Sequence, residues 1–206
     1  MTFDISRENC KFARKFQNIT VKSNRHQVII TPTEVLTDGK RLHTESTGHA
    51  LLTEVYRAHV DDYPKFFKMD TLCKVGFLAS ELLLQQEGDE RFVPRDDRAV
   101  VLFCQNASIK SDQAFEDTIR DREQFFPSPS VFVYTLPNIV TGEIAIRNKY
   151  TGETNLIVLP RRDDQQIQQH ARQLFLDGTA TSVITGWIDA PDNEHFAADM
   201  WIIQSS

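Results

Sequence analysis

Residues 135–154 read TLPNIVTGEIAIRNKYTGET, and the apolar run NLIVL follows at residues 155–159. A polar segment then leads to Gly178, and residues 181–190 read TSVITGWIDA. The first part predicts a helix over roughly Pro137–Asn148, and the two apolar runs predict strands at Asn155–Leu159 and Thr181–Ile188. This alternation of helices and apolar strands is typical of an α/β fold.

The polar segment between the two strands predicts a helix with one buried face. It begins RRDDQQIQQH at residue 161, so charged and amide side chains dominate it. Its apolar residues recur at the spacing i, i+4, i+7, i+8, which indicates a single buried stripe and an opposite face in water. These apolar residues are Ile167, Ala171, Leu174 and Phe175.

The remaining sequence extends this pattern in both directions. Apolar runs bounded by turn residues predict three further strands, at Gln27–Thr31, Arg98–Cys104 and Asp199–Gln204. Periodic apolar residues and helix stops predict three further helices, at Leu51–Val60, Met69–Gln86 and Asp112–Gln124. We expect these side chains to be buried: Leu78, Leu82, Val101, Phe103, Leu156, Val158, Val183 and Ile184.

The stretch 135–190 resembles the N-terminal half of a β-ketoacyl-acyl-carrier-protein synthase, a ketosynthase of the thiolase superfamily. In that family a helix with the pattern PN…A…IA…TG leads to a strand that ends at a reactive cysteine. Gly152, Gly178 and Gly186 align with the family's glycines without a gap. Arg161 then occupies the position of the reactive cysteine.

The resemblance is specific over residues 125–190, weaker over 66–104 and absent over 1–60. It implies a thiolase-like half-unit, which is a mostly parallel five-stranded sheet with helices on both faces, in a single domain over residues 1–206. Residues 1–20 are expected to form an arm. A complete synthase is about twice as long, and its second half carries two further catalytic groups, usually histidines. We therefore expect a truncated member of the family.

The replacement at Arg161 removes the nucleophile that the resemblance implies. A thiolate in the first turn of a helix is stabilised by the macrodipole and by free N–H groups, so it attacks thioesters readily. A guanidinium has no such reactivity and brings a cation to the positive end of the helix. We expect Arg161 to turn outward or to pair with Asp163 or Asp164.

Cysteine, histidine, serine and acidic residues elsewhere in the sequence are the alternative candidates for a reactive group. Cys104 ends a strand but has no paired base in the sequence, which favours a buried structural thiol. The six histidines are scattered without metal-ligand spacing, His170 is predicted to lie on a polar helix face, and we expect no metal or other cofactor. Ser128 and Ser130 are interpreted as loop residues. The acidic residues Asp112, Glu116, Asp117 and Asp121 are interpreted as a solvated helix face.

The resemblance also implies a subunit interface. In the family the strand before the nucleophile lies at the sheet edge and pairs with its copy in a second subunit. That strand here is apolar and uncharged, and an open edge of this kind recruits another strand unless something covers it. The residues expected at the interface are Asn138, Ile139, Gly142, Ile146, Leu156, Ile157, Val158 and Leu159. The alternative is that the N-terminal arm covers the edge.

Composition excludes several classes of function. The chain has 206 residues, 40% of them hydrophobic and 25% charged, and a net charge of −6 without a basic stripe. It therefore has the character of a soluble globular protein, and we expect no nucleic-acid partner. No apolar run is long enough to span a membrane and the N-terminus lacks a signal sequence. The three separate cysteines are typical of reduced thiols, so a cytoplasmic protein is predicted.

Two functional hypotheses remain. The first is a non-catalytic, ketosynthase-like interaction subunit in the assembly of fatty-acid, polyketide or pigment-type acyl chains. It would form a homodimer or a heterodimer with a full-length ketosynthase, with acyl carrier protein as a further possible partner. The second is an acyl-transferring or acyl-binding enzyme of the same superfamily that uses another site.

Overall fold

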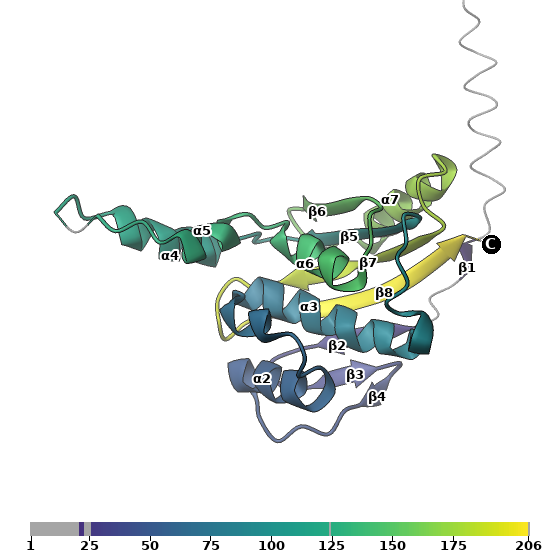
Figure 1. The fold of residues 1–206 in the computed structure, drawn as a ribbon, viewed down its shortest axis with the longest axis horizontal. Helices are drawn as coiled ribbons and strands as arrows, with labels where there is room; N and C mark the ends of the chain where they lie inside the picture. The colour runs from purple at the N-terminus through teal and green to yellow at the C-terminus, as the bar shows by residue number, and fades with distance from the viewer. Residues whose placement is uncertain (1–20, 23–25, 124, 206) are drawn as a thin grey trace, which may run out of the picture.

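The computed structural model describes residues 21–22, 26–123 and 125–205, and the predicted arm at 1–20 lies outside them. These residues form a sheet with helices on both faces (Figure 1). The strands are β1 (Val21–Lys22), β2 (Gln27–Ile30), β3 (Val35–Thr37), β4 (Lys40–Arg41), β5 (Arg98–Cys104), β6 (Thr154–Val158), β7 (Ser182–Asp189) and β8 (Ala197–Ser205). The α-helices are α2 (Gly48–His59), α3 (Thr71–Leu84), α4 (Ile109–Ile119), α5 (Pro129–Phe132), α6 (Ile139–Asn148) and α7 (Asp164–Leu176). Short 3-10 helices are η1 (Pro64–Lys68), η2 (Gln85–Glu90) and η3 (Val133–Thr135).

The sheet is mixed and has eight strands, so the prediction of a mostly parallel five-stranded sheet was wrong. Its order is β4-β3-β2-β8-β7-β5-β6, and β1 pairs with the end of β8. Among the described strands, only β6 with β5 and β5 with β7 pair in parallel. The loop between β7 and β8 is short, and a short loop permits an antiparallel neighbour, whereas a parallel one needs a long crossover.

The additional strands come from a hairpin in the N-terminal part. Asp38 and Gly39 both have positive φ, 50° and 74°, which is the conformation of a two-residue hairpin turn. This turn joins β3 to β4, and β3 in turn pairs with β2. The strands β1, β3 and β4 were not predicted, because strands of two or three residues are too short to show an alternation of apolar and polar side chains.

The helix α3 lies at the centre of the larger core. All of its residues except Lys74 are buried, since the sheet, α2 and α6 all pack against it. Its N-terminus is capped by Asp70, whose side chain accepts a hydrogen bond from the Cys73 backbone N–H at 2.8 Å. The predicted bounds of this helix and of α6 agree with the structure to within two residues, and Leu78 and Leu82 are buried as predicted.

The helix α7 covers the opposite face of the sheet. Ile167, Ala171, Leu174 and Phe175 are buried against β5 and β7, and this second core also holds Val101, Phe103 and Val183, as predicted. Most of the other α7 residues are exposed, so the helix has one buried stripe and one wet face. Ile184 is buried in the larger core, again as predicted.

Two predictions of burial were wrong. Leu156 is half-buried and Val158 has 52% of its surface exposed, because β6 is the last strand of the sheet.

The charged helix predicted at Asp112–Gln124 begins earlier, at Ile109, and ends at Ile119. No helix in the described residues is long and apolar enough to cross a membrane.

Candidate functional site

The strand β6 forms one edge of the sheet. It pairs with β5 on one side, Leu102 opposite Leu156 and Phe103 opposite Ile157, and no described strand lies on its other side. Leu156 packs toward the larger core, while Ile157 and Leu159 pack toward the core beneath α7. The outer edge of β6 therefore offers backbone groups and apolar side chains without a described partner.

The helix α6 lies beside β6 and contacts it. Ile139 and Gly142 are half-buried, Asn138 is exposed and Ile146 has 69% of its surface exposed. A Cβ added to Gly142 would meet no atom within 4 Å, so the space in front of this helix face is open. The eight residues predicted for an interface thus lie on α6 and β6 or directly beside these two adjacent elements. Whether a partner binds there remains a prediction.

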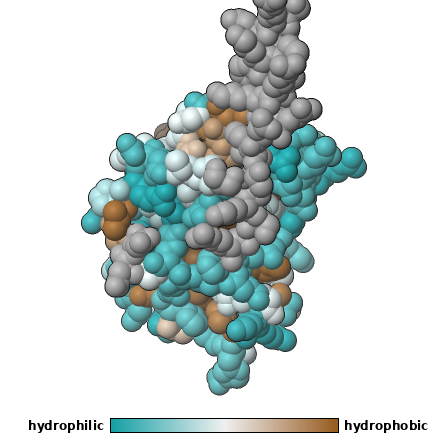
Figure 2. Space-filling view, turned by 90° about the vertical axis from the view of Figure 1, so that its right-hand side faces the viewer, coloured by the Kyte–Doolittle hydropathy of each residue, from teal (hydrophilic) through white to brown (hydrophobic). Residues whose placement is uncertain are grey.

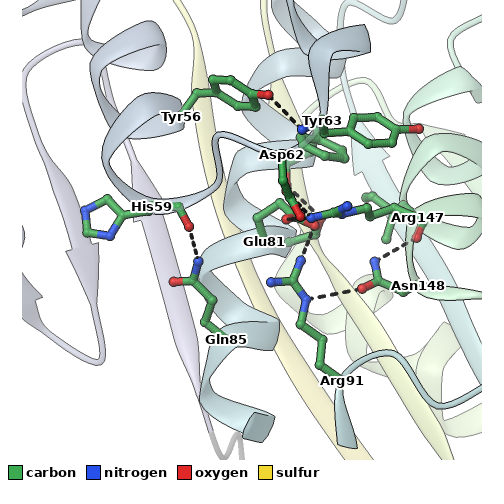
Figure 3. Close-up of polar contacts among 12 residues, drawn as sticks. Tyr56, His59, Asp62, Tyr63, Glu81, Gln85, Arg91, Arg147 and Asn148 are labelled. Carbon is green, nitrogen blue, oxygen red and sulfur yellow. Dashed lines mark hydrogen bonds and ion pairs between the residues drawn. The ribbon is translucent and has the colours of Figure 1, made fainter. Parts of the chain in front are cut away.

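A buried charge network fixes α6 against α3 (Figure 3). The Glu81 side chain is fully buried in α3, and its Oε2 lies 3.5 Å from Nη2 of Arg147 in α6. Arg91 forms a second ion pair with Glu81, and Arg147 also pairs with Asp62. The side chain of Asn148 accepts a hydrogen bond from Arg91 Nε at 3.4 Å. Breaking such a network leaves buried charge unpaired, so it holds α6 in one orientation.

The segment between β5 and α6 projects away from the sheet (Figure 1). We call its described residues, 109–123 and 125–136, the arm; it is distinct from the N-terminal arm predicted at residues 1–20. It contains α4, α5 and η3. The ring centroids of Phe115 in α4 and Phe132 in α5 lie 5.2 Å apart, so this aromatic contact joins the two helices of the arm. At its base, Ser108 Oγ donates to the Thr135 carbonyl at 2.8 Å. Ser128 lies just before α5 and caps it by accepting from the Val131 N–H, whereas Ser130, also interpreted as a loop residue, lies within α5.

Among the residues that the structure describes, the arm carries more than half of the large exposed apolar side chains. These are Ile109, Phe125, Phe126, Phe132, Val133 and Leu136, and Phe126 is the most exposed at 77%. In contrast, hydrophilic side chains dominate the opposite end of the molecule, where apolar residues form separate small spots (Figure 2). This surface was not predicted, although the run FFPSPSVF could have indicated it, since the apolar residues that flank two closely spaced prolines cannot all be buried in a short loop.

Cys73 and Cys104 lie in buried environments that suppress the reactivity of their thiols. Cys104, at the end of β5, is buried, and burial raises the pKa of its thiol to about 11. Burial likewise raises the pKa of Cys73 well above its usual value. Both are protonated at neutral pH, which agrees with the structural role predicted for Cys104. Cys10 lies outside the described residues. No group of three or more metal-ligating side chains occurs in the part of the chain that the structure describes.

Comparison with known proteins places this arrangement in a known fold. No protein-family model and no curated protein matches the chain. It is similar to the solved ishigamide ketosynthase/chain length factor, with a TM-score of 0.64 and 17% identity over 90% of this chain and 62% of that one. It is also similar to the complex of the ketosynthase ApeO with its chain length factor ApeC from Xenorhabdus doucetiae, with a TM-score of 0.62 and 12% identity over 91% of this chain and 79% of that one. The chain has the ketosynthase fold.

A third ketosynthase structure extends the likeness. It is AntDE:AntF, in which a type II acyl carrier protein is bound to its ketosynthase, with a TM-score of 0.58 and 13% identity. The match covers 90% of this chain and 62% of that one. The chain therefore spans less than two thirds of the length of two of these three relatives with the ketosynthase fold.

In this ketosynthase fold Arg161 lies in the loop between β6 and α7. It is exposed, as expected. Hydrogen bonds from Gln166 are the main cause of the lowered pKa of Asp163, and the positive charge of Arg161 contributes to the same shift. Asp163 caps α7 by accepting from the N–H groups of Gln165 and Gln166. The neighbouring Arg162 pairs with Asp164 and with Asp199 of β8, both at 2.7 Å. The loop thus carries two cations and a helix cap, and its residues 159–163 include no thiol or hydroxyl.

Proposed function

We propose that the chain is a non-catalytic, ketosynthase-like subunit that pairs with an intact ketosynthase through the β6 edge and α6. The observation that carries the proposal is the apolar outer edge of β6 on a ketosynthase fold. Pairing would give the free N–H and C=O groups of this edge partners and would remove Val158 and Ile146 from water.

The loop before α7 supports the non-catalytic part of the proposal. In the family that the sequence resembles, the position aligned with Arg161 carries the cysteine that receives the acyl group. Residues 159–163 read LPRRD and include no thiol or hydroxyl. Acyl transfer through a covalent intermediate requires a nucleophilic side chain, and in that family the nucleophile is the cysteine thiol. The intact partner would supply it, and this chain would shape the complex, as the name chain length factor indicates for the relatives.

The arm gives the proposed subunit a second contact region. Its exposed phenylalanines belong to a segment that projects away from the sheet (Figure 1), so a partner paired along β6 would have to extend beyond the body of this chain to cover them. Burial of large aromatic side chains contributes strongly to association. We therefore include Phe125, Phe126 and Phe132 in the proposed interface.

The pathway would be the assembly of a fatty-acid, polyketide or pigment-type acyl chain, with acyl carrier protein as a further partner. A tagged chain should be recovered from its native organism in a complex with a complete ketosynthase, identified by mass spectrometry. Coexpression of the two should then give one species at equal stoichiometry. Recovery of the chain alone, with no complex after coexpression, would contradict the proposal.

Variants at the edge make the test specific. Ile157→Lys and Val158→Lys should each abolish coelution, because the interface would have to desolvate an unpaired ammonium. Phe126→Asp should weaken coelution without changing thermal stability, since the side chain is exposed in the free chain. Thr33→Lys, an exposed change near the other side of the sheet, is the matched control and should coelute as the parent does. Coelution of all four variants would show that the β6 edge is not the interface.

A further inference from the structure

A separate cavity of about 610 Å³ lies where three segments of the chain meet. One wall is the start of α3, the second is the base of the arm, and the third is the loop between β7 and β8. Ala107 follows β5 and Ala190 follows β7, so the cavity opens beside the carboxyl ends of two parallel strands. Open α/β sheets commonly bind ligands at this edge, and the volume is typical of small-molecule sites.

The lining of this cavity is mainly apolar. The side chains that form its walls include Met69, Leu72, Ala114, Val131, Tyr134 and Ala190. Met69, Leu72, Tyr134 and Ala190 belong to the buried core, so these parts of the wall are held in place by packing. A rigid apolar wall of this kind accommodates the hydrocarbon or aromatic body of a small molecule.

Positive charge is concentrated at the same cavity. Lys68, Lys74 and Lys110 line it, and the only carboxylate among its lining residues is Asp70. In the described part of the chain, none of these three lysines forms an ion pair within 4.0 Å. Asp70 is engaged by neutral donors, because its Oδ1 accepts from the Cys73 N–H and its Oδ2 accepts from Ser111 Oγ at 2.6 Å. The cavity therefore has an excess of positive charge.

Lys74 is the most enclosed of these cations. It is the one residue of α3 that is not buried, and its Nζ donates to Nε2 of His49 at 3.4 Å. The same ammonium lies 5.7 Å from the centre of the Phe66 ring. Burial lowers the pKa of Lys74, and burial together with the Lys74 charge lowers the pKa of His49, so the imidazole is a neutral acceptor. An ammonium that has lost part of its water in this way gains when an anion enters.

We propose that this cavity binds an amphipathic monocarboxylate, with the carboxylate beside Lys74 and the apolar body against Leu72, Val131 and Tyr134. The site uses neither β6 nor α6, although one of its walls belongs to the arm whose exposed phenylalanines are included in the proposed interface. A failure to bind a ketosynthase would leave the binding measurement below unaffected, because that measurement is made on the chain alone.

Titration calorimetry with octanoate as the probe tests the proposal. Octanoate should bind at one site per chain, and octan-1-ol, octylamine and inorganic phosphate should each bind at least about tenfold more weakly. The reason is that each lacks either the negative charge or the apolar body, and a charge-assisted contact of this kind corresponds to about a tenfold change in affinity. Equal binding of octan-1-ol or of phosphate, or no binding of octanoate at millimolar concentration, would overturn the proposal.

Three variants locate the site. Lys74→Met should weaken octanoate binding about tenfold or more by removing the cation while keeping most of the length of the side chain. Ala114→Phe should weaken it by filling the cavity from the exposed face of α4, a change that leaves the charge intact and the fold undisturbed. Lys40→Met, an exposed lysine in β4, is the control and should bind as the parent does. Unchanged binding by both Lys74→Met and Ala114→Phe would overturn the assignment, and the Ala114 variant decides it if the Lys74 variant does not fold.

Discussion

The backbone oxygen of Asp199 lies where a side chain on Gly186 would have to begin. A Cβ added to Gly186 would stand 2.1 Å from this oxygen, and the φ angle of Gly186 is 146°, which is rarely adopted by residues with a side chain. Gly186 belongs to β7 and Asp199 to β8, which pair antiparallel at the centre of the sheet. The side chain of Asp199 also binds Gln27 of β2 and Arg162 beside α7. Asp199 therefore connects β8 with β7 through its backbone, and with β2 and the loop before α7 through its side chain.

Gly186→Ala should destabilise the protein by at least about 2 kcal/mol, because the added methyl group collides with backbone and the φ angle becomes strained. Gly142→Ala in α6 is the matched control. A Cβ meets nothing within 4 Å there, and replacing glycine inside a helix should stabilise by about 0.5–1 kcal/mol. Urea denaturation of the two variants measures both changes, and a stable Gly186→Ala protein would contradict the described contact.

Glu81→Gln should destabilise by about 3–5 kcal/mol, because Arg91 and Arg147 would keep their charges inside the protein without an anion between them. Glu116→Gln on α4 removes a carboxylate of an exposed pair with Arg120 and should cost less than about 1 kcal/mol. Chemical denaturation is again the measurement. Similar costs for the two substitutions would mean that Glu81 is not an essential part of a buried network.

Leu82→Ala should cost about 2–5 kcal/mol, since Leu82 is almost fully enclosed in the core around α3. Ile146→Ala removes an apolar side chain of similar size from the exposed face of α6 and should cost less than about 1 kcal/mol in the free chain. A cost below about 1 kcal/mol for Leu82→Ala would show that α3 does not pack as described.

The buried thiols should make the protein less stable at alkaline pH. The pKa of Cys104 is about 11 in the folded state against a usual value of 9.0, and the shift of Cys73 has the same direction. Above pH 9 the unfolded chain loses these protons while the folded chain keeps them, so the free energy of unfolding should fall between pH 9 and 11. In a Cys10→Ser background, a thiol reagent at pH 8 should modify the native protein slowly and the denatured protein at once. Rapid modification of the native protein would contradict the burial.

Incubation with an acyl-thioester should leave the mass of the chain unchanged. Arg161 offers no nucleophile, and the thiols of Cys73 and Cys104 are buried and protonated. Intact-mass spectrometry provides the measurement, and a complete ketosynthase treated in parallel provides the positive control. A stable acyl adduct on Cys10, Cys73 or Cys104 would refute the non-catalytic function, and so would malonyl-dependent condensation.

The sequence by itself determined the longer helices and strands and the buried faces of α3 and α7. The spacing of Ile167, Ala171, Leu174 and Phe175 predicted the single buried stripe of α7, and the run of apolar residues in α3 predicted a core helix. Both predictions succeeded because helix periodicity is a local property, which the order of side chains along the chain expresses directly. The absence of a thiol or hydroxyl between residues 159 and 163 is likewise a property of the sequence alone.

Only the tertiary structure decided the direction and the exposure of the strands. An apolar run has the same appearance in a parallel or an antiparallel strand, and in a central or an edge strand, so the antiparallel β8 and the exposed Val158 could not be recognised from their residues. The burial of Glu81 and the meeting of Lys74 with Leu72, Val131 and Tyr134 at one cavity depend on segments that are far apart in the sequence. Such arrangements arise from how the helices pack on the sheet, and periodicity carries no information about contacts at that range.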